Sequence, residues 1–302
     1  MTDVKHTYKV SSDCIDMRLD RYVANLLSLS RKQVRELITI KAITINDITA
    51  DKAGTLLAVD DHVQVDPNKA QQLHTITPNP DLDIPILFED EELLIVNKPP
   101  NMGVHPLGPL QTDTVINGLL AKYPQIQGVG EGGLRSGVVH RLDVDTTGTL
   151  IIALTDTGYQ IGREAITDKQ NTLKQYRALV HGKLPHDEQA VHRNLVMAQH
   201  KPARVKVIKN ATIESRHCSL RSRVLETFKN ASYIEVDLQT GFLHQIRVLL
   251  EHLGNPILGD TLYGESNDLP RCMLHAHHIQ FGIVDITAPI PEDMNHALDQ
   301  YR

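Results

Sequence analysis

The sequence predicts an α+β protein, with a small N-terminal module of helices and strands and a larger domain built on a mainly antiparallel mixed sheet. Three observations support this prediction. The 302 residues are enough for one large domain and one small one. Helical periodicity changes to strand periodicity within residues 16–66. The later chain has many short strands with few helices between them, whereas a doubly wound parallel sheet needs a helix between successive strands.

Composition places the chain among soluble globular proteins. Hydrophobic residues make up 41% and charged residues 23%. No apolar run reaches the ~18 residues of a membrane span, and the N-terminus lacks the apolar segment of an export signal. The three cysteines are widely spaced and suit a reducing compartment. We therefore expect a cytoplasmic protein without a membrane partner, and we expect a monomer.

Residues 16–66 form the first unit of the predicted fold. Asp16 is expected to cap a first helix and Ser30 a second, because apolar residues follow each of them at helical spacing. Apolar residues then alternate with polar ones at 43–45 and 63–65, which predicts short strands.

Four basic residues gather on and just after the second helix: Arg31, Lys32, Arg35 and Lys41. A helix N-terminus and basic side chains together can hold phosphates, although an ordinary solvated helix face would show the same charges. The net charge of −6 disfavours nonspecific coating of nucleic acid and leaves room for a local basic patch.

The string MRLDRYVANLLSLSRKQVRELITIKAITIND, residues 17–47, resembles the S-four-like RNA-binding module of ribosomal and RNA-modifying proteins. The matching features are Arg-Leu-Asp at the first helix, Ser30-Arg31 at the second, and a short strand that ends in Asn46. Ala42 lies in the region where the family commonly has a glycine. The resemblance implies RNA as a partner and assigns the four basic residues to RNA binding.

The chain beyond this module is expected to contain a linker, 67–83, a larger domain, 84–290, and a frayed tail, 291–302. The linker is rich in Pro, Asn and Gln and lacks periodicity. Strands are expected near 86–88, 93–96, 137–139, 150–154, 176–180 and 234–238, and helices near 112–123 and 243–253, the second of which ends at Gly254.

The stretch 137–148 carries the strongest chemical signal. It places a polar loop with His140, Arg141, Asp143 and Asp145 between two expected strands, at the edge of a rigid sheet where sites commonly lie. Asp145 and the following threonines can equally satisfy the backbone of a turn. Asp143 and Asp145 could also act as an acid–base pair of a hydrolase, although nothing fixes the spacing which that chemistry requires.

Two further segments contain candidate side chains. His244 and Arg247 are three residues apart, so they share a face near the start of the expected helix. There Arg247 could meet an anion, or it could pair on the helix surface with Glu251. Tyr176 begins an alternating strand, where a tyrosine is usually a core or edge residue.

Together these segments resemble an RluA-type pseudouridine synthase over nearly the whole chain. The spaced His-Arg-Leu-Asp and His-Gln-Ile-Arg motifs occur in the family's order behind the S-four-like module. The matching strings are NKPPNMGVHP (97–106), SGVVHRLDVDTTGTLIIALT (136–155), KQYRALVHGKL (174–184), TGFLHQIRVLLEHLGNPILGDTLYG (240–264) and LHAHHIQF (274–281).

The resemblance implies an enzyme that isomerises uridine to pseudouridine in structured RNA, most often in large-subunit ribosomal RNA, without a cofactor. It also implies site residues. The catalytic aspartate of the family matches Asp143, the tyrosine that stacks on the uracil matches Tyr176, and the arginine that pairs with the aspartate matches Arg247. Arg141 matches the arginine implicated in flipping the target base.

The same motifs contain further candidates for contact with the substrate: His140, His244 and Gln245. His140 and His244 could instead hydrogen-bond the loops of the site. Three histidines of the last motif, His275, His277 and His278, invite a metal hypothesis, but no carboxylate or cysteine spacing completes a ligand set. We therefore expect no metal.

The implied chemistry explains these residue types. The N1–C1′ bond breaks, the uracil rotates, and C5 joins C1′. A carboxylate can attack the sugar carbon covalently or act as a base at C2′, so Asp143 must be ionised. A guanidinium within reach favours that form, which suits Arg247. Tyr176 offers a flat face for the uracil and a hydroxyl that could remove the C5 proton.

The chain departs from the usual family pattern at four positions. Phe242 and Leu243 replace Arg-Thr, Leu249 replaces a histidine, and Val144 replaces a common lysine. The changes at 242 and 249 are expected to remove polar groups near the RNA. The alternative function is therefore an RNA-binding ribosome assembly factor whose catalytic activity has decayed.

Overall fold

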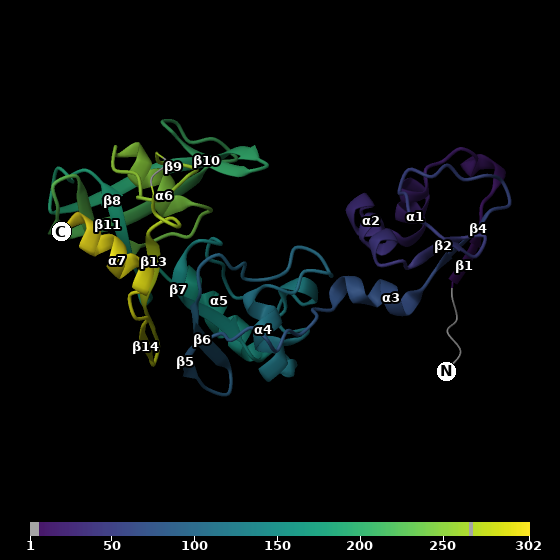
Figure 1. Ribbon diagram of the computed structural model, residues 1–302, viewed down its shortest axis with the longest axis horizontal. Coiled ribbons are helices and arrows are strands. Elements are labelled where there is room, and N and C mark those ends of the chain that lie inside the picture. The colour runs from purple at the N-terminus through teal and green to yellow at the C-terminus, as the bar shows by residue number, and fades with distance from the viewer. Residues whose placement is uncertain (1–5, 266–267) are drawn as a thin grey trace.

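The computed structural model describes residues 6–265 and 268–302 and confirms the α+β prediction. In Figure 1 the small N-terminal module lies at the right and the larger domain at the left, joined by a short helical segment.

The N-terminal module contains a four-stranded antiparallel sheet with the order β1-β4-β2-β3. Two helices pack on it through apolar residues such as Leu19, Val34 and Leu37, which are fully buried. Its elements are β1 (His6–Lys9), η1 (Ser12–Cys14), α1 (Leu19–Leu27), α2 (Arg31–Thr39), β2 (Ile43–Ile45), β3 (Ile48–Thr49) and β4 (His62–Val65).

One of the two expected helix caps is present. The side chain of Ser30 accepts from the backbone N–H of Gln33, and Gln33 reciprocates, so α2 begins with a capping box. Asp16 is not a cap, because α1 begins only at Leu19. The backbone N–H of Asp16 donates to Leu57 instead, so the chain pairs with another segment before it turns into the helix.

The expected linker 67–83 is partly helical, with α3 (Pro67–Gln71) and η2 (Gln72–His74). Asp66 caps α3 by accepting from two backbone N–H groups. Leu73 packs into the core of the N-terminal module, whereas Ile76 packs into the larger domain. The chain therefore passes from one core to the other within a few residues.

The larger domain is built on one sheet with the order β10-β9-β11-β12-β8-β13-β7-β6-β5, and β14 pairs with β13. Among the described residues its ladders are antiparallel except that between β7 and β13. Its strands are β5 (Ile86–Glu89), β6 (Leu93–Lys98), β7 (Thr147–Ala153), β8 (Leu173–His181), β9 (Glu188–His200), β10 (Ala203–Ile208), β11 (Arg216–Thr227), β12 (Ala231–Leu238), β13 (Leu274–Phe281) and β14 (Val284–Thr287).

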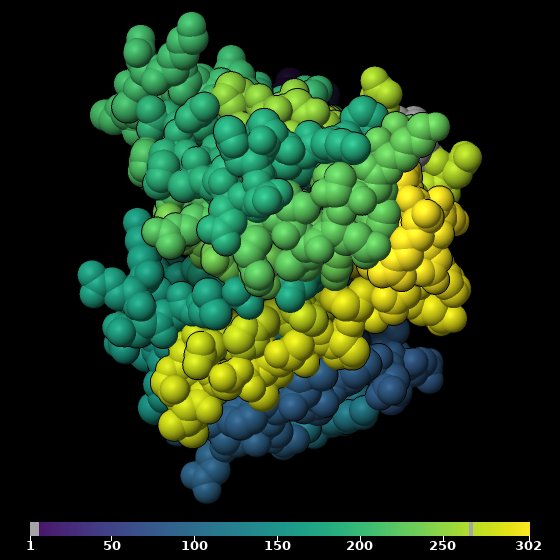
Figure 2. Space-filling model, turned by 90° about the vertical axis from the view of Figure 1, so that its left-hand side faces the viewer, coloured from purple at the N-terminus to yellow at the C-terminus, as the bar shows by residue number. Residues whose placement is uncertain are grey.

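A strand from the end of the chain completes the middle of this sheet. β13 lies between β8 and β7, and in Figure 2 the yellow C-terminal segments lie between the green strands and the blue N-terminal part of the domain. β13 approaches β7 closely at Gly148, whose φ is +108°, and a Cβ there would lie 2.1 Å from the carbonyl oxygen of Ala276. The glycine of the expected loop is therefore required for this approach.

The helices of the larger domain pack against the sheet. α4 packs over one face of β6 and β7, and α5 over the other, so that every residue of β7 is buried. This makes β7 a rigid support for the loop that precedes it. The helical elements are α4 (Val115–Lys122), η3 (Pro124–Ile126), η4 (Gly133–Arg135), α5 (Asp156–Thr167), α6 (Gln245–His252) and α7 (Glu292–Tyr301).

The expectation of a frayed tail is wrong, because 291–302 forms α7. Met294, Ala297 and Leu298 are buried in the core of the larger domain. Arg271 also forms a bidentate ion pair with Asp293, at 2.6 and 2.8 Å. Apolar burial and this ion pair together hold the helix in place.

Other expected boundaries shift. Residues 137–139 do not form a strand, since only Val138 makes an isolated bridge, to Ile152. The helix expected near 112–123 begins at Val115 and is capped by Thr114. α6 begins at Gln245, because His244 has a left-handed backbone (φ 52°), and Gly254 follows its end with φ +83°, as expected.

Candidate active site

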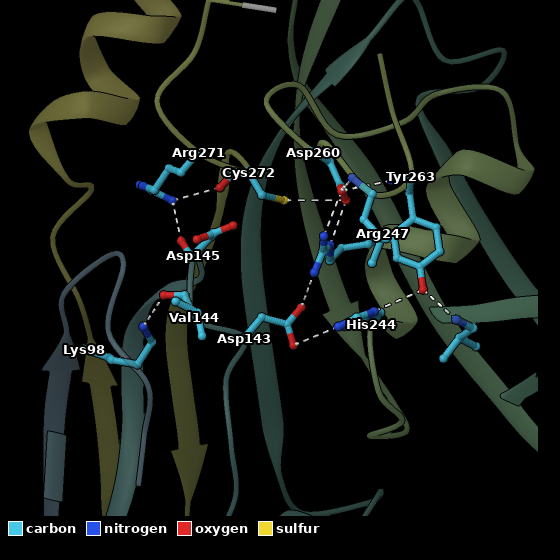
Figure 3. A network of polar contacts seen from close by, with 12 residues as sticks. Lys98, Asp143, Val144, Asp145, His244, Arg247, Asp260, Tyr263, Arg271 and Cys272 are labelled. Atoms are coloured by element: carbon cyan, nitrogen blue, oxygen red, sulfur yellow. Dashed lines mark hydrogen bonds and ion pairs between the residues drawn. The ribbon is translucent and has the colours of Figure 1, made fainter. Parts of the chain in front are cut away.

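Asp143 lies in the loop that enters β7, and the backbone of this loop is fixed on both sides. The carbonyl of Val144 accepts from the Lys98 ammonium at 2.8 Å, and the carbonyl of Asp145 accepts from Arg271 at 3.1 Å. Figure 3 shows both cations reaching the loop from the side opposite Arg247. The Asp143 carboxylate thus projects from a backbone that is held by two buried cations, and its side chain is 23% exposed.

Arg247 connects two carboxylates. Its Nη1 donates to Oδ2 of Asp143 at 2.8 Å, and its Nε and Nη2 donate to Asp260 at 2.7 and 2.8 Å. Asp260 is fully buried and also accepts backbone N–H groups from Leu262 and Tyr263. The two-bond contact with Asp260 fixes the plane of the guanidinium, and the third nitrogen is thereby directed at Asp143.

Electrostatic interactions stabilise the charged forms of Arg247 and Asp260. Burial alone would lower the pKa of Arg247, but its hydrogen bonds to Asp260 and the nearby negative charges raise that pKa above its usual value. Burial by itself would raise the pKa of Asp260. The Arg247 guanidinium and two backbone N–H groups have the larger, opposite effect, so the pKa of Asp260 is lowered. The alternative partner of Arg247, Glu251, is excluded by this geometry.

His244 lies on the other side of the Asp143 carboxylate. Its Nε2 is 3.9 Å from Oδ1 of Asp143, and its Nδ1 is 3.0 Å from the hydroxyl oxygen of Tyr263. Burial lowers the pKa of His244, and the opposing effect of Asp143 does not cancel this. The imidazole is therefore neutral near pH 7. His244 and Arg247 both face the Asp143 carboxylate, as expected from their spacing of three residues.

Tyr176 lies on β8, between Val236 of β12 and Ala276 of β13. Its side chain is 9% exposed, and its hydroxyl makes no hydrogen bond to the residues that the structure describes. Burial raises the pKa of Tyr176, and the negative charge of Asp143 adds to the effect. The phenol is therefore protonated at neutral pH, with the carboxylate close enough to influence it.

The fold and this site match one protein family. A family model described as RNA pseudouridylate synthase covers residues 92–252, and an S4 domain model covers residues 17–73. The chain belongs to the RNA pseudouridylate synthase family. Its activity is therefore the isomerisation of uridine to pseudouridine in RNA, and the resemblance read from the motifs is confirmed.

Individual relatives support this assignment. The synthase is 32% identical to an uncharacterized RNA pseudouridine synthase of Bacillus subtilis, over 94% of each chain. It is 33% identical to ribosomal large subunit pseudouridine synthase D of Zymomonas mobilis, again over 94% of each chain. The structure of human RNA pseudouridylate synthase domain containing 4 has the same fold, with a TM-score of 0.59 and 22% identity over 72% of this chain and 93% of the human one.

Three of the expected substrate-binding residues have different surroundings in the synthase. Arg141 is exposed beside the Asp143 loop and makes no ion pair with the described residues. His140 accepts the backbone N–H of Ile151 through Nε2, and burial lowers the pKa of His140 to about 3. Gln245 is buried and bonds Thr240, Phe242 and Ser219.

Contact of His140 and Gln245 with substrate therefore stays a prediction, while the groups named above have partners within the protein. His140 ties the site loop to β7, and Gln245 ties the turn before α6 to β11. Both residues position the backbone through these bonds, which use Nε2 of His140 and both amide atoms of Gln245. Arg141 remains available to RNA.

Sequence reasoning missed four residues that build the site: Lys98, Asp260, Tyr263 and Arg271. Lys98 is fully buried and donates to the carbonyls of Pro99, Met102 and Val144, each at 2.8 Å. Burial lowers the pKa of Lys98 to about 7, whereas the three acceptors favour the ammonium form, which alone has three donors. Lys98, Asp260 and Tyr263 lie within the matching strings, so a search for buried charge there could have found them.

Two of the four basic residues expected to bind RNA have side-chain partners within the protein, and two make no ion pair in the described part of the chain. Arg31 bonds the buried carboxylate of Asp20 at 2.7 Å, so its fork is used within the module. Lys32 donates to the carbonyl of Leu107 in the larger domain at 3.0 Å. Arg35 and Lys41 are exposed and make no ion pair with the described residues. Phosphate binding by these four residues stays a prediction, in which Arg35 and Lys41 are the two for which the described chain shows no ion pair and Lys32 lies at the junction of the two bodies.

The departures from the family pattern are mostly packing residues. Leu249 is fully buried, and Phe242 and Leu243 pack against the same core. The expectation that position 249 borders the RNA is therefore wrong, since its side chain faces the interior. Val144 is 53% exposed next to Asp143 and is the departure that borders the site.

The three clustered histidines have separate protein partners. His275 bonds the hydroxyl of Thr147, His277 the carbonyl of Ala288, and His278 the carboxylate of Asp285. Within residues 6–265 and 268–302 no group of three His, Cys, Asp or Glu side chains is placed to hold a metal ion. In the same part of the chain no helix is long and apolar enough to cross a membrane.

Proposed function

We propose that this synthase modifies a uridine in structured RNA of the large ribosomal subunit, with Asp143 acting on the sugar of the flipped nucleotide. The observation that carries the assignment is the contact of Asp143 with Arg247, whose other nitrogens are fixed by Asp260. Relatives named ribosomal large subunit pseudouridine synthase D support the substrate class.

The two oxygens of Asp143 have different surroundings. Oδ2 accepts from Arg247, whereas Oδ1 makes no hydrogen bond with the described residues and faces His244 at 3.9 Å. Oδ1 is therefore the oxygen that can reach C1′ as a nucleophile or the C2′ proton as a base. Retaining Arg247 on Oδ2 keeps the carboxylate oriented during either step.

Tyr176 serves the reaction through its ring. Because burial and Asp143 both raise the pKa of Tyr176, a phenolate is unavailable near pH 7 as a base at C5. Its ring can stack on the uracil after the glycosidic bond breaks, and an enclosed site keeps the free base from diffusing away. The proton lost from C5 is balanced by one gained at N1, so the isomerisation needs no redox cofactor or phosphoryl donor.

RNA binding is shared between the larger domain and the N-terminal module. Arg141 beside the loop can occupy the space that the flipped base leaves, which lowers the cost of unstacking. Arg35 and Lys41 can contact phosphates further away. All four residues of the central site, Asp143, Tyr176, Arg247 and Asp260, come from one chain, so this site needs no residue from a second subunit and we propose a monomer. A cytoplasmic location is proposed from the ribosomal RNA substrate class.

The test is the conversion of large-subunit ribosomal RNA labelled with tritium at uracil C5. We expect the protein to release tritium and the Asp143→Asn variant to release none, with RNA affinity and folding nearly unchanged, because the substitution keeps volume and removes charge. Activity of this variant within tenfold of the wild type would refute the role of Asp143. Mapping pseudouridines in a deletion strain by carbodiimide labelling identifies the uridine. An unchanged ribosomal RNA pattern would refute the substrate class.

A decayed RNA-binding assembly factor is the alternative. The complete contact between Asp143 and Arg247 and the internal positions of Phe242, Leu243 and Leu249 speak against it. That alternative predicts RNA binding without tritium release from any ribosomal RNA.

A further inference from the structure

The turn that follows α6 contains both residues that orient the donors beside Asp143. Asp260 accepts the backbone N–H of Tyr263, so the two side chains are held in one turn. Asp260 fixes Arg247, as described above. The ring of Tyr263 is buried, with the Arg247 guanidinium 5.3 Å from its centroid and the His244 ring meeting it edge-on at 5.6 Å.

The hydroxyl of Tyr263 has two partners with different roles. It accepts the backbone N–H of Val205, on β10, at 2.8 Å. A backbone N–H can only donate, so the phenolic hydrogen remains for a second bond. The acceptor within reach is Nδ1 of His244, at 3.0 Å. Figure 3 shows the hydroxyl of Tyr263 directed at the His244 ring.

This arrangement determines the tautomer of His244. A neutral imidazole that accepts at Nδ1 carries its hydrogen on Nε2. That nitrogen lies 3.9 Å from Oδ1 of Asp143, which exceeds hydrogen-bond distance. The N–H and the unpaired carboxylate oxygen therefore stand side by side, and both are available to a substrate atom.

We propose that Tyr263 is a positioning residue that holds His244 as the Nε2–H tautomer, so that His244 donates to an oxygen of the bound nucleoside beside Asp143. The ribose hydroxyls and ring oxygen are the acceptors of the right chemistry at the carbon on which Asp143 acts. The inference rests on the proposed role of Asp143, and it adds a second donor to that of Arg247.

The pH dependence of the reaction distinguishes this role from mere packing. The charged and titratable groups that face His244 are Asp143 from the loop, Arg247 from α6, and Asp260 and Tyr263 from the turn. The donated hydrogen of Tyr263 favours the neutral imidazole. Its loss should raise the pKa of His244. A protonated His244 would place a positive charge 3.9 Å from Oδ1 of Asp143 and compete with the substrate for that oxygen. The acidic limb of the rate profile should therefore move to higher pH.

The experiment compares Tyr263→Phe with the wild type in single-turnover tritium release at saturating large-subunit ribosomal RNA, from about pH 5.5 to 9. We expect the rate to fall about tenfold or more, the acidic limb to move to higher pH, and RNA affinity to change less than twofold, because a lost orientation acts on the chemical step. A wild-type rate and pH profile would overturn the inference.

A matched control shows whether the change in rate is specific to the Tyr263 hydroxyl or follows from the loss of any tyrosine hydroxyl. Tyr123→Phe removes a hydroxyl that bonds Glu89 on the surface, away from the site, and should leave rate and pH profile unchanged. Because Tyr263→Phe also leaves the Val205 N–H without its partner, the melting temperature of each variant is measured and rates are taken where both are folded.

A double-mutant cycle tests whether Tyr263 acts through His244. If Tyr263 acts through His244, adding Tyr263→Phe to His244→Ala should change the rate less than twofold, whereas independent roles would give multiplied losses and overturn the inference. Asp143→Asn is run in parallel. An active Asp143→Asn variant means that the proposed function fails, while an inactive one together with a wild-type Tyr263→Phe means that only this inference fails.

Discussion

Arg247 gives two of its hydrogen bonds to Asp260 and only one to Asp143. The buried carboxylate of Asp260 thus orients the guanidinium, and the carboxylate of Asp143 receives the remaining donor. This division explains how a half-buried loop residue and a residue on α6 can keep a fixed geometry although they are 104 positions apart in the chain.

Replacing Arg247 by Lys should reduce the rate at saturating RNA by about a hundredfold or more, with a modest loss of RNA binding. Lysine keeps the charge but has a single nitrogen and cannot contact Asp260 in two bonds and Asp143 in a third. Single-turnover tritium release measures the effect. Glu251→Gln on the same helix is the control and should behave as the wild type, while the opposite pattern would mean that Arg247 acts with Glu251.

Replacing Lys98 by Met should lower the free energy of unfolding and the rate together. Methionine fills similar space but leaves the carbonyls of Pro99, Met102 and Val144 without their donor. At about 1–3 kcal/mol for a buried polar group left unpaired, the loss should be at least about 3 kcal/mol. Urea unfolding measures it. Lys122→Met, which loses an exposed ion pair with Asp83, is the control and should cost less than about 1 kcal/mol. Equal stabilities of the two variants would contradict the role of Lys98.

Acidification should destabilise the protein before its carboxylates titrate. Burial lowers the pKa of His140 to about 3 and that of His275 to about 4, whereas both should titrate near 6.5 in the unfolded chain. Between these values the unfolded state binds more protons, so stability falls as pH falls from about 6.5 towards 4.

Urea midpoints at several pH values test this expectation. His140→Gln can still accept the Ile151 N–H but does not titrate, so its stability should depend less steeply on pH in that window. His296→Gln, at an exposed position on α7, should keep the wild-type slope. An unchanged slope for His140→Gln would show that His140 is not buried in its neutral form.

Deleting residues 1–74 should separate RNA affinity from chemistry. The cut keeps Ile76, which is buried in the larger domain and bonds Gln127 through its backbone. Losing Arg35 and Lys41 should weaken binding to long structured RNA and make its salt dependence shallower. Chemistry at saturating RNA should persist within about tenfold, because the site lies wholly in the larger domain.

Single-turnover assays at several salt concentrations measure both effects. The double variant Arg35→Gln/Lys41→Gln in the full chain is the companion test and should reproduce part of the affinity loss. A truncated protein that is folded but cannot react at saturating RNA would contradict this separation of binding from catalysis.

Local patterns in the sequence were enough for the two-body α+β organisation and the capping of α2 by Ser30. The resemblance of the motifs, rather than any local pattern, pointed to Asp143, Tyr176 and Arg247, and the structure places Asp143 and Arg247 in contact. These depend on periodicity, turn chemistry and motif spacing, which a short stretch of chain contains. The same patterns put the start of α1 too early, because the backbone of Asp16 pairs with Leu57 instead of capping the helix. They also predicted a frayed tail, because they could not show that α7 is buried against the core of the larger domain.

Only the tertiary structure decided which polar groups are free to act. His140, Gln245 and Arg31 look like contacts for substrate or RNA in the sequence, but each meets a partner brought to it by the fold. Asp260, Tyr263, Lys98 and Arg271 gain their roles in the same way. A hydrogen bond or ion pair depends on distance in space, and Arg271 reaches the Asp145 carbonyl across 126 positions of sequence. The sequence determined which chemical groups this protein has, and the packing of β7, β13 and α6 determined which of them meet in the candidate site.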